Sequence, residues 1–260
     1  MDRRSDPFFD VPKEVVSISK GPIELPACYY DASNYLALFR VDAAKAAEKL
    51  RGTPVEPVLV SRKAAVVALG FYKYRDTTLG PYHEVGLAIL ATPEDEPREL
   101  ASFNDLMEPS CRESLGSWVL DLPVTTPLAE AAGCEVWGYP KFVAQLPIEL
   151  DGDRFHAEVL DPDGKLIMEL SGQRGYALPE ELPGMALLTY SMREGQLLRT
   201  RVATRSRGRT SGGGSIGLVI GDSQHRMAKN LRDLALDGKT PKLLQTTEDF
   251  QSLLFAGEPV

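Results

Sequence analysis

Cysteine, histidine and tryptophan are scarce in this chain of 260 residues, with three, three and two copies. The cysteines are odd in number, widely spaced and without a C-x-x-C pair, which argues against a disulfide framework or structural zinc and favours a reducing, cytoplasmic setting. No apolar run approaches the ~18 residues of a membrane span. The first residues are charged, with no apolar segment after them, so we expect neither a secretory signal nor a membrane partner.

Basic residues are also fewer than acidic residues. The chain carries 29 Lys+Arg against 37 Asp+Glu, a net charge of −8, which argues against nucleic acid as a partner. Its 43% hydrophobic and 25% charged residues are typical of a globular protein. His83, His156 and His225 have no metal-ligand spacing, so we expect no metal site and interpret His156 as a surface or interface residue.

The chain does contain many short apolar runs, separated by glycine and proline. Such runs at residues 35–39, 64–72, 85–90 and 118–122 predict strands. FHAEVL and KLIMEL flank the turn sequence DPDG at residues 161–164, which predicts a hairpin. The strands do not alternate with helices, so we predict an α+β fold, predominantly antiparallel, whose curled sheet forms a cone or barrel.

Three short helices are predicted among these strands. Asp42 caps AAKAAEKL, Thr126 and Pro127 open a helix that we expect to end at Gly133, and the third covers residues 224–237. No linker divides the chain. We therefore expect a single domain over residues 21–260, preceded by an N-terminal arm at residues 1–20.

Several motifs have simple structural interpretations. Residues 212–217, GGGSIG, match a dinucleotide fingerprint only formally, because a strand-like run follows where a helix should begin. Gly-Asp-Ser at residues 221–223 is followed by His225, which is too close in sequence for a catalytic triad, and by no later histidine, so we interpret Asp222 or Ser223 as a helix cap. Alternate arginines between residues 199 and 209 are interpreted as one solvated strand face or a subunit contact, with attraction of an anionic ligand as the alternative.

One lysine stands among apolar neighbours. Lys141 lies in the segment EVWGYPKFV, residues 135–143. An apolar pocket disfavours the charged form of a lysine, and a neutral amine attacks a ketone to form a Schiff base. Taken alone, this segment also fits a surface lysine that lays its aliphatic stem along apolar neighbours.

Several segments resemble the acetoacetate decarboxylase family. WGYPKF at residues 137–142 is similar to that family's Tyr-Pro-Lys segment with its Schiff-base lysine. GPYHEVGLAIL at residues 80–90 resembles the strand with the active-site glutamate, and YLALFRVD at residues 35–42 resembles a strand that ends in an arginine. LPVTT at residues 122–126 is similar to the segment that precedes the lysine in many members of that family. The matches come in the family's order, from about residue 21 to the last helix.

The resemblance implies a β-rich cone or barrel, a homo-oligomer, and neither metal nor organic cofactor. It implies that Lys141 forms the imine by an activation already established for this family, and that Glu84 is a polar or proton-transfer group. Arg40 would support the acidic groups or orient the substrate carboxylate. The remaining substrate-binding residues that we predict are Tyr82, Trp137, Tyr139 and Phe142.

The sequence departs from the family at two positions. Phe142 stands where the decarboxylases place a second basic residue, and Gly70 stands where they carry another glutamate. The leading hypothesis is a cofactor-independent lyase that decarboxylates an acetoacetate-like β-keto acid through Lys141. The alternatives are a Schiff-base aldolase-dehydratase that joins pyruvate or another 2-oxo acid to an aldehyde, and a non-enzymatic ligand-binding protein that kept the fold.

Overall fold

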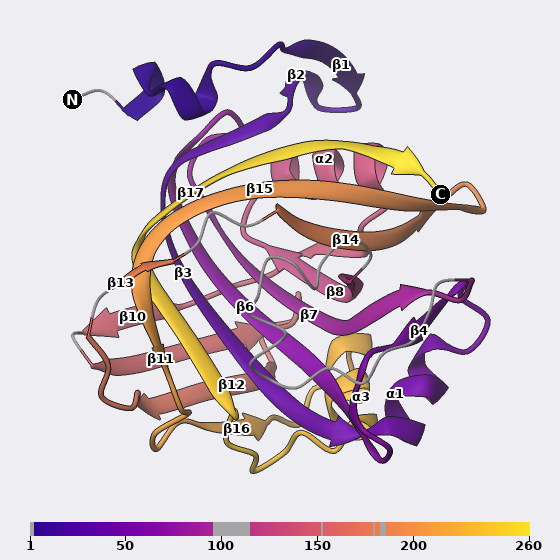
Figure 1. The fold of residues 1–260 in the computed structure, drawn as a ribbon, viewed down its shortest axis with the longest axis vertical. Helices are drawn as coiled ribbons and strands as arrows, with labels where there is room; N and C mark the ends of the chain where they lie inside the picture. The colour runs from indigo at the N-terminus through magenta and orange to yellow at the C-terminus, as the bar shows by residue number, and fades with distance from the viewer. Residues whose placement is uncertain (1–2, 96–114, 152, 179, 183–185) are drawn as a thin grey trace.

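The computed structural model describes residues 3–95, 115–151, 153–178, 180–182 and 186–260, and strands dominate it (Figure 1). The strands are β1 Glu14–Ile18, β2 Gly21–Leu25, β3 Ala27–Asp42, β4 Val55–Pro57, β5 Leu59–Ser61, β6 Ala64–Thr77, β7 Tyr82–Pro93, β8 Gly116–Val124, β9 Lys141–Val143, β10 Ile148–Asp151, β11 Arg154–Leu160, β12 Leu166–Gln173, β13 Glu180–Leu182, β14 Ala186–Arg193, β15 Gln196–Ser211, β16 Gly217–Ile220 and β17 Leu243–Pro259. The α-helices are α1 Ala43–Leu50, α2 Pro127–Trp137 and α3 Arg226–Asp233, and two 3₁₀ turns, η1 Arg3–Ser5 and η2 Pro7–Phe9, precede β1.

Seven long strands close into a barrel. They follow the order β7-β6-β3-β17-β15-β14-β8, and β8 returns to pair with β7. Every pairing around the barrel is antiparallel except β14 with β8. Irregular register in β3, β15 and β17 marks bulges, which let long strands bend around a closed sheet. The predicted antiparallel, curled-sheet barrel is therefore confirmed.

Strict alternation along three strands separates the inside of the barrel from its outside. The odd-numbered residues at 35–41 of β3, 65–71 of β6 and 85–91 of β7, such as Phe39, Leu69 and Leu87, belong to a buried apolar cluster on the outer face. The even-numbered residues at 34–38, 68–74 and 84–90 of the same strands line the interior cavity. Because side chains alternate along a strand, one run of sequence supplies both a packing face and a cavity wall.

A second sheet covers that outer face. It has the order β10-β11-β12-β16, all antiparallel, and its Phe155 packs against Tyr35 and Phe71 of the barrel. The predicted hairpin is confirmed as β11 and β12. Its turn is fixed by Asp161, whose side chain accepts hydrogen bonds from the backbone N–H groups of Asp163 and Lys165, and by Gly164 at φ 80°.

The three predicted helices are present, with corrected ends. Asp42 caps α1 and Thr126 caps α2, as expected. α2 continues past Gly133 to Trp137, because the left-handed residue that ends it is Gly138, at φ 64°. α3 is shorter than predicted, and its cap is the His225 side chain rather than Asp222 or Ser223. None of the helices in the described part of the chain has the length and apolar character of a membrane span.

The N-terminal arm packs against the barrel. β1 pairs with β2, so the boundary predicted at residue 20 falls inside a hairpin. Phe9 is buried against Tyr30, and Asp6 accepts hydrogen bonds from Arg205 of β15. The glycine-rich segment before β16 is a turn followed by a strand, as predicted, and a side chain at Gly213 would collide with the Pro241 carbonyl oxygen at 2.2 Å.

Candidate active site

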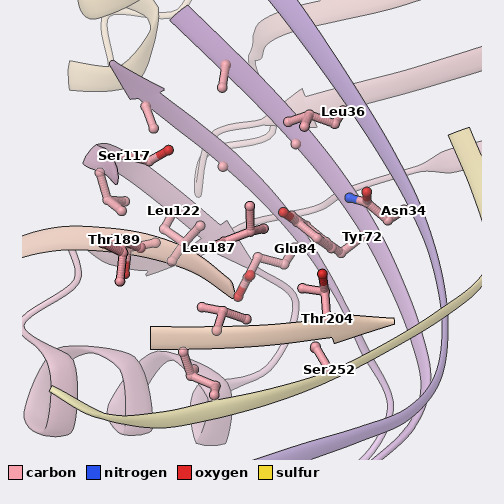
Figure 2. Close-up of a pocket in the computed structure, with 18 of the residues that line it drawn as sticks. Asn34, Leu36, Tyr72, Glu84, Ser117, Leu122, Leu187, Thr189, Thr204 and Ser252 are labelled. Carbon is pink, nitrogen blue, oxygen red and sulfur yellow. The ribbon is translucent and has the colours of Figure 1, made fainter. Parts of the chain in front are cut away.

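The barrel encloses a cavity of about 210 Å³. Figure 2 shows Glu84, Tyr72 and Leu122 among the side chains that line it. Apolar side chains make most of the wall. Among its uncharged polar groups, β3, β15 and β17 supply Asn34, Thr204, Ser206, Gln245 and Ser252, and Ser117 and Thr189 come from β8 and β14. Among the lining residues that the structure describes, Lys141 is the one cation and Glu84 the one anion.

Lys141 enters the cavity from the start of β9, which lies parallel to β8 with Lys141 opposite Leu122. The left-handed turn at Gly138 ends α2 and brings the chain back toward β8. The aliphatic part of Lys141 then passes over Gly133 of α2, where a Cβ atom would lie 2.3 Å from both Cδ and Cε. Only 4% of the lysine side chain is exposed. The helix end and one glycine together direct this lysine inward.

Glu84 faces Lys141 from β7. Its Oε2 lies 2.6 Å from the lysine Nζ, and 10% of its side chain is exposed. Glu84 Oε1 accepts a hydrogen bond of 3.4 Å from the Tyr74 hydroxyl. In a site so buried, each charge of the pair compensates the other, and removal of either partner leaves the other uncompensated.

Tyrosines surround this pair. The Tyr82 ring lies 5.8 Å from Lys141 Nζ, and its hydroxyl is 3.1 Å from that of Tyr29. Burial, and then the charge of Glu84, raise the pKa of Tyr74 and of Tyr82 well above the usual value. Burial also raises the pKa of Tyr139 to about 12. These phenols therefore stay protonated at neutral pH and serve as hydrogen-bond donors.

Three of the predicted site residues line the cavity, and a fourth contacts its ion pair. Lys141, Glu84 and Tyr139 are the lining residues, and the Tyr139 hydroxyl lies 2.6 Å from Thr189 Oγ1. Tyr82 is not a lining residue, but its ring contacts the Lys141 ammonium, so its predicted place beside the lysine fits.

The other three predictions need correction. Arg40 lies near the end of β3, beyond Leu38, where it is exposed and donates a hydrogen bond to Ser61. Phe142 follows Lys141 on a strand and points the opposite way, against the ring of His225 at 4.2 Å. Trp137 is fully buried, and its indole N–H donates to the carbonyl of Phe255. None of the three lines the described cavity.

Sequence reasoning missed several residues that do line it, among them Tyr72, Tyr74, Gly86, Asn34 and Gln245. The sequence signal that could have identified them is the alternation of side chains along a strand, which places every second residue on the same face. Tyr72 lies opposite Glu84 in the β6–β7 register, and Gly70 lies opposite Gly86. Gly70, where the family has an acid, also lines the cavity, and a Cβ there would lie 2.9 Å from the Tyr72 ring. The tyrosine ring thus occupies the space next to Gly70.

One histidine–carboxylate cluster lies outside this site. His156, Glu158 and Glu169 bring their ligand atoms within 4.8 Å of one another on β11 and β12. His156 and Glu158 lie two residues apart on β11, and strand pairing places Glu169 of β12 opposite Glu158. The spacing of the histidines alone therefore did not reveal the cluster. They are half-buried on the smaller sheet.

Comparison with known proteins gives a consistent result. The model of the acetoacetate decarboxylase family matches residues 16–202. The comparison with curated protein sequences finds no match. Among solved structures, an acetoacetate decarboxylase is 16% identical, with a TM-score of 0.65 over 90% of this chain and 89% of the other. The acetoacetate decarboxylase of Legionella pneumophila is 16% identical, with a TM-score of 0.62 over 99% and 93% of the two chains. The enduracididine biosynthesis enzyme MppR, complexed with pyruvate, is 13% identical, with a TM-score of 0.59 over 90% of each chain.

Proposed function

The chain belongs to the acetoacetate decarboxylase family, and we propose that it is a cofactor-independent carbon–carbon lyase that decarboxylates an acetoacetate-like β-keto acid through a Schiff base on Lys141. The observation that carries this proposal is the buried contact of 2.6 Å between Lys141 Nζ and Glu84 Oε2. The two residues line a largely apolar cavity inside a closed barrel. Such a cavity excludes water from the reacting carbon.

The reaction begins when the Lys141 proton passes to Glu84 across their hydrogen bond. The neutral amine attacks the ketone carbon and a C–N bond forms. The carbonyl oxygen takes one proton from the attacking nitrogen and one from Glu84, the C–O bond breaks, and the oxygen leaves as water. The product is a protonated imine, an electron sink one carbon away from the carboxylate. The bond to the carboxylate carbon then breaks, CO2 leaves, and its electron pair becomes the enamine double bond.

A proton must then reach the enamine carbon. Glu84, once it has taken a proton from water, is the nearest acid to Lys141, and the Tyr74 hydroxyl, which donates to Glu84 Oε1, holds that carboxyl group in place. Water finally hydrolyses the imine, releases the ketone and restores the amine. Phe142 points away and supplies no charge, so Glu84 is the group beside Lys141 that can act as the base and take its proton.

The second candidate is a Schiff-base aldolase-dehydratase that acts on pyruvate or another 2-oxo acid with an aldehyde. The same imine can lose a methyl proton instead of CO2, and the resulting enamine adds to an aldehyde. The observation that favours it is the described cavity lining, which holds one carboxylate, Glu84, and a glycine at position 70. Similarity in fold to the pyruvate-bound MppR supports the same candidate. A non-enzymatic binding protein is the third candidate; it predicts a Lys141 that is exposed or stays fully charged, and the side chain is only 4% exposed.

Borohydride trapping separates these candidates. The protein is incubated with acetoacetate or with pyruvate, reduced, and analysed by intact and peptide mass spectrometry. We expect a ketone-dependent adduct on Lys141 with acetoacetate, together with release of CO2. Lys141→Arg should abolish both, whereas Lys63→Arg, at an exposed turn, should change neither. An adduct with pyruvate alone would favour the aldolase-dehydratase, and unchanged turnover in Lys141→Arg would exclude the imine mechanism.

A further inference from the structure

The cavity extends beyond the Lys141–Glu84 pair into a space walled by small and aliphatic residues. Along β7 the inward-facing positions after Glu84 are Gly86 and Ala88, and on β6 their partners in the register are Gly70 and Ala68. We call this part of the cavity the chamber, and define it by Leu36, Leu38, Ala68, Gly70, Gly86 and Ala88.

Small inward side chains leave room for the chamber, and the Tyr72 ring takes up part of the space beside Gly70. Two adjacent strands carry only glycine or alanine at four paired inward positions, where β-branched or aromatic residues would be ordinary in a strand. Glycine in a strand interior weakens the strand, and often marks a place where a ligand approaches the backbone. A Cβ atom on Gly86 would lie 3.2 Å from Leu122 Cδ1, so even a methyl group there would narrow the chamber.

The size and chemistry of the chamber define what fits it. The six residues that define it carry no charge and no side-chain polar atom. With a rise of about 3.3 Å per residue, the wall from Glu84 to Ala88 is about 13 Å long. A cavity of about 150 Å³ already holds benzene, and the whole cavity here measures about 210 Å³. A methyl group, the side chain of acetoacetate, would leave most of this length unfilled.

We infer that the chamber binds an apolar side chain of several carbons attached to the reacting carbonyl, so that the substrate is a β-keto acid with a hydrocarbon tail longer than methyl. This inference rests on the proposed function, because it assigns the tail of the molecule whose carbonyl meets Lys141. Each methylene that moves from water into such a chamber raises affinity about fourfold. The chamber thereby sets chain-length preference, while Lys141 and Glu84 carry out the chemistry.

Two ketones of different length test the chamber separately from catalysis. Isothermal titration calorimetry compares acetone with 2-heptanone, which adds four methylenes to one side. We expect 2-heptanone to bind at least tenfold more tightly. Gly86→Val should weaken 2-heptanone binding at least fivefold and change acetone binding less than twofold. The control Gly217→Val adds the same side chain to β16, at a glycine where an added Cβ atom would meet nothing within 4 Å, and should change neither.

A smaller filling change, Ala88→Val, gives the same test if Gly86→Val does not fold. Equal affinities for the two ketones, or an equal effect of Gly217→Val, would overturn the inference. Failure of the proposed function has a different signature: 2-heptanone binds tightly but borohydride traps no adduct on Lys141. If both hold, the rate constant kcat/KM for 3-oxooctanoate should exceed that for acetoacetate by tenfold or more, and Gly86→Val should reduce this ratio.

Discussion

The aliphatic stem of Lys141 occupies the space that a side chain on Gly133 would need. A Cβ atom at position 133 would lie 2.3 Å from Cδ and Cε of the lysine. Gly133 lies inside α2 rather than at its end, in a place where alanine would be the better helix former. The glycine therefore leaves space for the Lys141 side chain, at the expense of helix propensity.

Gly133→Ala tests this relationship. Helix propensity alone would stabilise the variant by about 1 kcal/mol, but forced overpacking in a buried site costs about 1–3 kcal/mol. We expect a net loss of stability in urea unfolding and at least a tenfold slower trapping of ketone on Lys141. Gly217→Ala, where the added methyl meets nothing within 4 Å, is the control. If the Gly133→Ala protein were more stable and fully reactive, the Lys141 side chain would not pack against position 133.

The ion pair in the cavity predicts an asymmetric response to substitution. Glu84→Leu leaves the Lys141 ammonium buried without its counter-charge, and we expect a loss of about 3–5 kcal/mol in the free energy of unfolding. The double variant Lys141→Met/Glu84→Leu removes both charges and should recover most of that loss. Urea unfolding at neutral pH measures both. Equal stability of the wild type and Glu84→Leu would contradict a charged pair in the resting protein.

Replacement of Gln245 by an apolar residue should stabilise the protein. Its side-chain amide nitrogen is buried in the cavity wall and makes no hydrogen bond within the described part of the chain. An unsatisfied buried donor costs about 1–3 kcal/mol, so Gln245→Met should be more stable by about 1 kcal/mol. Gln251→Met is the matched control on the same strand, because Gln251 donates to the Tyr30 carbonyl and accepts from Arg205. That variant should lose stability, and a loss in both would contradict the prediction.

Acid should weaken the barrel through Asp31. The Arg75 guanidinium, which donates to both oxygens of Asp31, lowers the pKa of that carboxyl group below its usual value. A lowered folded-state pKa stabilises the protein fully above the unfolded pKa, about 3.9, and the stabilisation is lost as pH falls through the folded value. Asp31→Asn should therefore show a shallower loss of stability below about pH 4 than the wild type. Urea unfolding at several pH values measures the slope, with Asp10→Asn, at the exposed end of η2, as control. An unchanged slope in Asp31→Asn would argue against this linkage.

Local sequence chemistry determined the elements of this protein. Short apolar runs became β6, β7 and β8, the DPDG turn closed the β11–β12 hairpin, and Asp42 and Thr126 capped their helices where expected. These features depend on residues a few positions apart, which a single sequence records. Lys141 and Glu84 were also identifiable, since the segments around them resemble those of a known family.

Only the tertiary structure decided which of these residues meet. Arg40, on the same strand face as Leu38, extends past the end of the cavity, and Phe142, next to Lys141 in sequence, points to the opposite side of β9. The chamber exists because register places Gly70 opposite Gly86, on strands that close into a barrel through the contact of β8 with β7. Register and closure depend on pairings between distant segments, whose energies come from packing across the whole sheet rather than from any local pattern.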